Sequence, residues 1–103
     1  MILQQPRLAW DGARVIVRAI DSERLYPWLH TRLGELAGPG YQQALSDSCH
    51  RLWWTERMDA PNAEAGLWRA RLADLLQTRP ELAGPLQELI DETAALLAES
   101  PAA

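Results

Sequence analysis

Proline and glycine breaks divide this sequence into segments whose apolar residues recur at the spacing of an α-helix. Apolar side chains three, four, seven and eight residues apart share one face of a helix, whereas those of a half-buried strand alternate. The clearest breaks are Gly38-Pro39-Gly40 and Asp59-Ala60-Pro61-Asn62. The pattern therefore predicts a series of short amphipathic helices joined by turns.

Residues 10–20 allow two interpretations. Asp11-Gly12 is typical of a hairpin turn, and the segment after it is rich in β-branched residues. A strand, however, would mix Arg14 and Arg18 with apolar residues on one face. A helix gives a cleaner apolar face, made of Ala9, Ala13, Ile16, Val17 and Ile20. We predict a helix, with the hairpin as the alternative.

The next two helices are expected on either side of the glycine-rich break. Asp21 or Ser22 can cap the first of them, which must begin between residues 22 and 26 because Pro27 is tolerated only in a first turn. The second covers about 41 to 58. We expect its core face to consist of Tyr41, Leu45, Cys49, Leu52 and Trp53.

Two more helices follow. The first starts after an Asp59 cap, ends near Gln77 and has a core face of Ala65, Trp68, Leu72, Leu75 and Leu76. Thr78-Arg79-Pro80-Glu81 then predicts a capping box, in which the threonine hydroxyl accepts the amide of Glu81. Gly84-Pro85 should kink the last helix or shorten its first turn.

Together these segments predict an all-α fold, a compact bundle of about five amphipathic helices. At 103 residues the chain has the length of one domain. We place that domain at 8–99, between a flexible N-terminal segment at 1–7 and a tail at 100–103.

Charge and apolar run length exclude several classes of protein. Fourteen acids against ten arginines give a net charge of −4, without the basic footprint that nucleic acid requires. Purely apolar runs such as Val15-Ile16-Val17 are far too short to cross a membrane. With no leader and a single cysteine, Cys49, we expect a cytoplasmic protein without disulfides.

The residue types for catalysis are sparse. Cys49 and His50 would point about 100° apart on a helix, so they cannot form a nucleophile–base pair. With His30 they also supply too few ligands for zinc. We predict a non-enzyme with no catalytic residue, no cofactor, no metal and no small-molecule substrate; a ligand pocket built from tryptophans is a weaker alternative.

The five tryptophans suggest where a partner could bind. Helical phase assigns Trp28, Trp53 and Trp68 to the core. Trp54 falls on the polar side with His50, and Met58 lies one turn further on. An exposed tryptophan beside an exposed methionine is typical of a protein-binding hot spot, for another protein or for self-association. The alternative is a thicker bundle that buries both Trp53 and Trp54.

Acidic residues are concentrated in the last helix. From residue 80 onward there are five acids and no arginine. We expect Glu88 and Glu92 to lie on an acidic outer face that is either simply solvated or a docking face for a basic partner.

The two C-terminal helices resemble a known family. Leu67-Trp68-Arg69-Ala70-Arg71-Leu72, Arg79-Pro80-Glu81-Leu82-Ala83 and the leucines up to Ile90-Asp91-Glu92 are similar to the short helical domains common in actinobacterial proteins of unknown function. Gly84-Pro85 and Trp53-Trp54 depart from that pattern. The resemblance implies an adaptor-like or effector-associated interaction module of a signalling or defence system. A small acidic inhibitor of a larger machine, of phage type, is the alternative.

Overall fold

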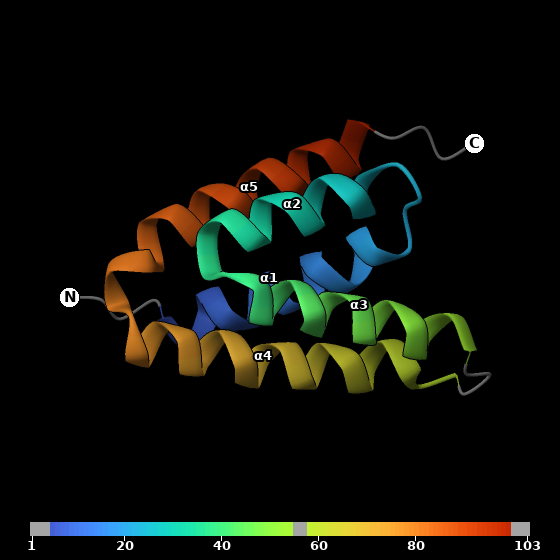
Figure 1. The fold of residues 1–103 in the computed structure, drawn as a ribbon, viewed down its shortest axis with the longest axis horizontal. Helices are drawn as coiled ribbons and strands as arrows, with labels where there is room; N and C mark the ends of the chain where they lie inside the picture. The colour runs from blue at the N-terminus through green and yellow to red at the C-terminus, as the bar shows by residue number, and fades with distance from the viewer. Residues whose placement is uncertain (1–4, 55–57, 100–103) are drawn as a thin grey trace.

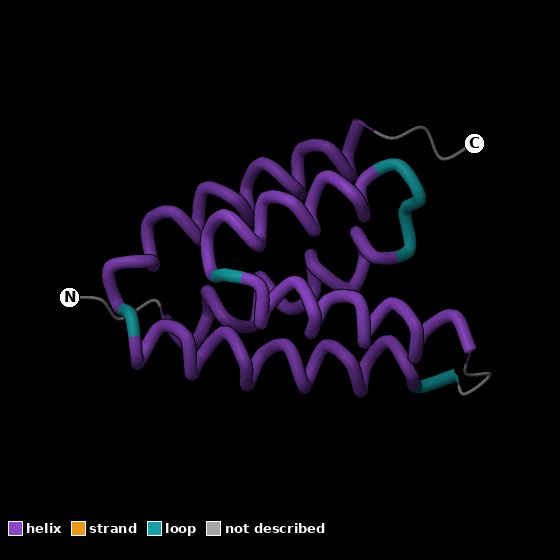
Figure 2. Tube along the Cα trace, in the orientation of Figure 1, coloured by secondary structure: helices purple, strands orange, loops and turns teal. Residues whose placement is uncertain are grey.

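Five α-helices and one 3-10 turn make up the part of the chain that the computed structural model describes, residues 5–54 and 58–99 (Figure 1, Figure 2). They are α1 (Gln5–Ile20), α2 (Leu25–Ala37), α3 (Pro39–Trp54), α4 (Ala60–Thr78), η1 (Pro80–Leu82) and α5 (Ala83–Glu99). No strand occurs in these ranges, so the all-α prediction is confirmed. Helix α1 begins inside the segment expected to be flexible, and residues 1–4 and 100–103 lie outside the description.

Helix α1 lies at the centre, between the α2–α5 pair and the α3–α4 pair (Figure 1). It packs most extensively on α4 and α5 and also touches α2 and α3. Close approach is possible because a β-carbon at Gly12 would lie only 2.7 Å from Ile90 Cδ1 and 2.8 Å from Leu72 Cδ1. Asp11-Gly12 is therefore part of a packed helix and not a hairpin turn, so the helical prediction for residues 10–20 is confirmed.

The turn between α2 and α3 is the glycine-rich break expected from the sequence. Gly38 has a φ of 99°, in the region that favours glycine, and its N–H donates to the Gly34 carbonyl at 2.9 Å. Helix α3 starts at once, at Pro39, two residues earlier than predicted. At the other end of α2, the Ser22 hydroxyl accepts the Leu25 N–H at 3.2 Å, as expected of a cap.

The predicted capping box at Thr78-Arg79-Pro80-Glu81 is wrong. Thr78 is the last residue of α4, and its hydroxyl donates to the Asp74 carbonyl at 2.9 Å. The side chain of Glu81 pairs instead with Arg79, at 3.3 Å. Thr78 therefore belongs to α4, and η1 lies between α4 and the start of α5 at Ala83. This start leaves Pro85 in the first turn of α5, where its missing N–H is harmless.

Candidate protein-interaction surface

Two adjacent tryptophans and a methionine are exposed at one end of the bundle. The exposed fractions are 64% for Trp53, 77% for Trp54 and 97% for Met58. Trp53 and Trp54 end α3, and Met58 lies in the turn that leads into α4. We call these three residues the aromatic end surface. The predicted exposure of Trp54 and Met58 is confirmed, and the alternative that buries both tryptophans is wrong.

The assignment of Trp53 to the core is also wrong. Leu45 and Ser48 are buried and Leu52 is half-buried, so the covered face of α3 runs through these positions. Trp53 lies about 100° further round the helix than Leu52. Figure 1 shows the last turn of α3 extending past the end of α1. Trp53 lies in this turn and is mostly exposed.

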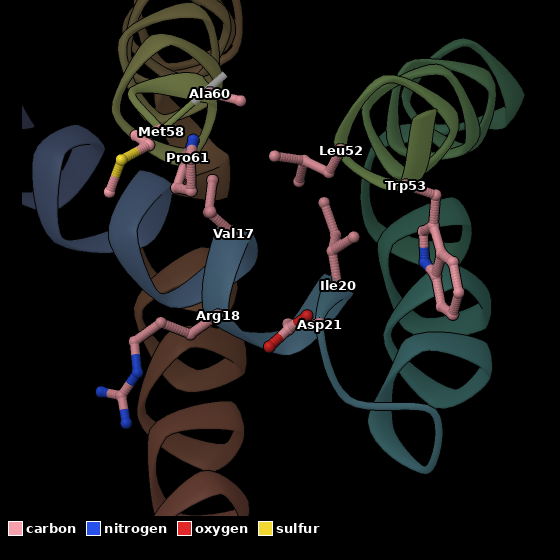
Figure 3. Close-up of a pocket in the computed structure, with 9 residues that line it drawn as sticks. All are labelled: Val17, Arg18, Ile20, Asp21, Leu52, Trp53, Met58, Ala60 and Pro61. Atoms are coloured by element: carbon pink, nitrogen blue, oxygen red, sulfur yellow. The ribbon is translucent and has the colours of Figure 1, made fainter. Parts of the chain in front are cut away.

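A groove of about 540 Å³ lies between the end of α3 and the adjoining ends of α1 and α4 (Figure 3). Ile20 and Leu52 point into it from α1 and α3, and Met58 borders it on the α4 side. Arg18 and Asp21 add one charge of each sign. The groove is therefore of mixed polarity, and its two charged lining residues have opposite signs.

Trp53 also borders a second, shallower hollow of about 340 Å³ on the α2 side of α3. Its other lining residues are Tyr26, Ser46, Cys49, His50 and Trp54. The His50 and Trp54 rings are 6.0 Å apart, so the structure brings these two predicted site residues together. The aromatic end surface is thus flanked by a hollow on each side.

Polar groups beside the second hollow make weak contacts. The Tyr26 hydroxyl donates to Ser46 Oγ at 3.3 Å, and His30 Nε2 lies 3.4 Å from the same oxygen. Burial raises the pKa of the Cys49 thiol, while hydrogen bonds with Trp53 and Tyr26 act in the opposite direction. A thiol with a raised pKa stays protonated near neutral pH, so Cys49 is a poor nucleophile.

The other three tryptophans all have arginine partners. Trp10 is 42% exposed and has the guanidinium groups of Arg14 and Arg69 within 6 Å of its ring centre. Arg32 lies 5.3 Å from the half-buried Trp28, and Arg71 lies 5.3 Å from the buried Trp68. Through these cation–π contacts, all three rings have partners within the chain itself.

Glu88 and Glu92 do not belong to the aromatic end surface. Both are exposed on α5, which packs on α1 and α2. The carboxylate of Glu92 accepts a hydrogen bond from Arg32 Nη1 at 2.8 Å. The structure therefore divides the predicted site residues between two surfaces.

A buried polar network was missed by the sequence analysis. Ser48 donates to Glu64 Oε1 and accepts from Trp68 Nε1, both at 2.8 Å. The Arg51 guanidinium meets the same carboxylate side-on, with Nε 2.6 Å from Oε2 and Nη2 2.9 Å from Oε1. Hydrogen bonds from Arg51 lower the pKa of Glu64, although burial opposes this effect. The network fastens α3 to α4 two residues before Trp53.

A signal for this network exists in the sequence. Glu64 lies one turn before Trp68 on the core face of α4, and Ser48 lies in phase with Leu45 and Leu52. Polar residues in phase with core residues of two neighbouring helices predict a buried hydrogen bond between them.

Comparisons with models of known protein families, with curated proteins and with solved structures find no match for this chain. None of the described helices is long and apolar enough to span a membrane. Within the described ranges, no group of three histidine, cysteine or acidic residues is placed to hold a metal ion.

Proposed function

We propose that this protein is a non-enzymatic protein–protein interaction module that docks through the aromatic end surface. The observation that carries the proposal is the exposure of Trp53, Trp54 and Met58 beside a groove of mixed polarity. Tryptophan and methionine are enriched at protein interfaces, and binding energy concentrates on a few such anchors. The family resemblance adds that the module is an adaptor of a signalling or defence system.

Energetics supports a binding role for these residues. Single exposed apolar residues are normal on any protein and need no explanation. Here, however, two neighbouring indoles lie between two hollows, while the other tryptophans have arginine partners. Burying a large apolar side chain contributes roughly 1.5–3 kcal/mol. Covering both rings therefore offers several kcal/mol to a partner at little cost in side-chain ordering, because tryptophan has few rotatable bonds.

The test is a comparative capture experiment. The immobilised protein and its Trp53→Ala/Trp54→Ala variant are exposed to extract of the source cells, and retained proteins are quantified by mass spectrometry. We expect at least one protein to be enriched about tenfold or more by the wild-type chain over the variant. The enriched protein is then purified and titrated against both, to show direct binding.

Trp10→Ala is the matched control, since it removes a half-exposed tryptophan from the other end of α1. It should retain the same proteins as the wild type. Equal retention by the wild type and the double variant would contradict the proposal.

The acidic face of α5 supports a second candidate function, a small inhibitor that blocks a basic groove. The exposed acids of α5 are Glu88, Asp91, Glu92 and Glu99, and Glu81 lies just before it in η1. In that case a Glu88→Gln/Glu92→Gln variant, rather than the tryptophan variant, should lose the partner. Binding should also weaken steeply as salt is raised, because exposed charges are screened.

A further inference from the structure

The aromatic end surface places exposed, projecting side chains directly beside a groove. The rings of Trp53 and Trp54 are largely exposed, and the groove of about 540 Å³ lies directly beside Trp53 (Figure 3). A two-fold interface uses the same patch on both partners, so every projection must meet a hollow of the same patch. A surface that carries both features next to each other meets this requirement.

The charges around the groove are also balanced. Arg18 and Asp21 are exposed, lie three residues apart on the same wall and carry opposite signs. A strongly basic or acidic partner would meet one like charge here. A two-fold axis can instead bring Arg18 of one copy opposite Asp21 of the other, twice in each interface.

The exposed area of the two tryptophans is consistent with a weak, reversible association of two copies. Since an aromatic side chain buries roughly 150–250 Å², the exposed fractions of Trp53 and Trp54 correspond to about 200–350 Å² per copy. A standard interface covers about 800 Å² on each partner. The indoles thus supply less than half of a standard interface, and Met58 and the groove walls add to them, so we expect the pair to be weak and reversible.

From these three observations we infer that the partner seated on the aromatic end surface is a second copy of this chain, related by a two-fold axis. The inference rests on the proposed function and names its partner. In this arrangement an exposed tryptophan of each copy enters the groove of the other copy. Arg18 of each copy pairs with Asp21 of the other.

The first test is the mass of the purified protein in solution, measured by light scattering and sedimentation from about 1 µM to 1 mM. We expect the mass to rise with concentration from 11.6 kDa toward twice that value, with a midpoint on the order of 10–100 µM. Trp54→Ala should raise the dissociation constant at least tenfold, whereas Trp10→Ala should not change it. Circular dichroism checks that both variants keep the wild-type helix content.

Met58→Glu is an independent variant at a position that is 97% exposed, so it can add a charge to the surface without disturbing the core. It should also keep the protein monomeric. A mass that remains that of one chain up to 1 mM, or association that survives in both Trp54→Ala and Met58→Glu, would overturn the inference.

A charge exchange tests the two-fold arrangement itself. Arg18→Asp gives two acidic rim residues, and Asp21→Arg gives two basic ones, so each variant alone should associate several-fold more weakly than the wild type. Mixed in equal amounts, the two should form a heterodimer near wild-type strength, because every rim contact then joins unlike charges. A mixture no stronger than either variant alone would show that the copies do not pair in this way.

These measurements separate the inference from the function on which it rests. If the protein is monomeric throughout while capture of another protein still depends on Trp53 and Trp54, self-association is wrong and the proposed function stands. If neither self-association nor capture depends on these residues, both are wrong.

Discussion

At the scale of residues, α3 buries a polar side chain and exposes a large apolar one. Ser48 is fully buried, whereas Trp53 is mostly in solvent. The serine is tolerated because its hydroxyl uses its one donor position on Glu64 and an acceptor position on Trp68. A buried polar group is costly only when its hydrogen bonds are missing. Partner geometry therefore decides whether such a residue suits the core.

Replacing this hydroxyl should destabilise the protein. Ser48→Ala leaves the buried Trp68 indole N–H without its acceptor, so we expect the free energy of unfolding to fall by about 1–3 kcal/mol in a urea titration. Ser46→Ala, on the same helix, removes only the longer contacts to Tyr26 and His30 and should cost less. Equal losses in the two variants would argue against the network.

Glu64 should make stability depend on acid pH. Its pKa is lowered in the folded state, so its contribution is fully present above the unfolded pKa and is lost as pH falls through the folded value. We expect Glu64→Gln to cost about 1–2 kcal/mol at pH 7, a moderate loss because the Arg51 side chain is 44% exposed.

The difference between wild type and Glu64→Gln should shrink as pH drops below about 4. Urea titrations at several pH values give this comparison directly. A difference that grows toward acid pH would show that the ion pair does not stabilise the fold.

At the scale of elements, helix boundaries follow local chemistry only where one signal acts alone. The break at Gly38 was predictable, because few residues other than glycine adopt a φ of 99°. At Thr78 two signals compete. The threonine can cap the following turn or bond back to its own helix, and in the structure it bonds back to Asp74. Sequence spacing alone cannot rank these two outcomes.

Gly38→Ala should therefore be destabilising even though a β-carbon would meet nothing within 4 Å. We expect a loss of about 1–2 kcal/mol from backbone strain. Gly40→Ala is the matched control, because Gly40 has equally open surroundings but lies in α3 without a positive φ. It should leave stability unchanged or raise it by up to about 1 kcal/mol. Thermal unfolding of both variants measures the difference.

At the scale of the whole molecule, α1 holds the bundle together because it touches each of the other four described α-helices. At Gly12, the Leu72 side chain of α4 and the Ile90 side chain of α5 both come within 3 Å of where a β-carbon would lie. The exposed end of the bundle is a consequence of the same arrangement. Helix α3 extends past the end of this central helix (Figure 1), and in its last turn Leu52 is half-buried against the core while Trp53 and Trp54 are exposed.

Enlarging Gly12 should thus affect the entire fold. Gly12→Leu forces the Leu72 and Ile90 side chains apart, and we expect it to cost about 1–3 kcal/mol or more. Gly66→Leu, where a β-carbon meets nothing within 4 Å, is the matched control and should be nearly neutral. Urea unfolding followed by circular dichroism distinguishes them. Similar stability of both variants would contradict the central role of α1.

Much of the fold could be predicted from the sequence because it depends on local spacing. The periodicity of Ala13, Ile16, Val17 and Ile20 predicts α1, and glycine and proline mark the boundary between α2 and α3. The candidate surface was predicted only in part. Trp54 and Met58 were expected to be exposed, but Trp53 was placed in the core and the buried contact between Ser48 and Glu64 was not predicted.

These failures share one physical reason. Helical phase tells which side chains share a face, but burial depends on whether another helix lies over that face. This is set by helix packing, because Leu52 faces Ile20 of α1 (Figure 3), whereas Trp53 lies about 100° further round α3 and is mostly exposed. The periodicity of the chain thus specifies five helices and their apolar faces. The packing of the helices on one another determines that Ser48 and Glu64 are buried and that Trp53 and Trp54 remain exposed.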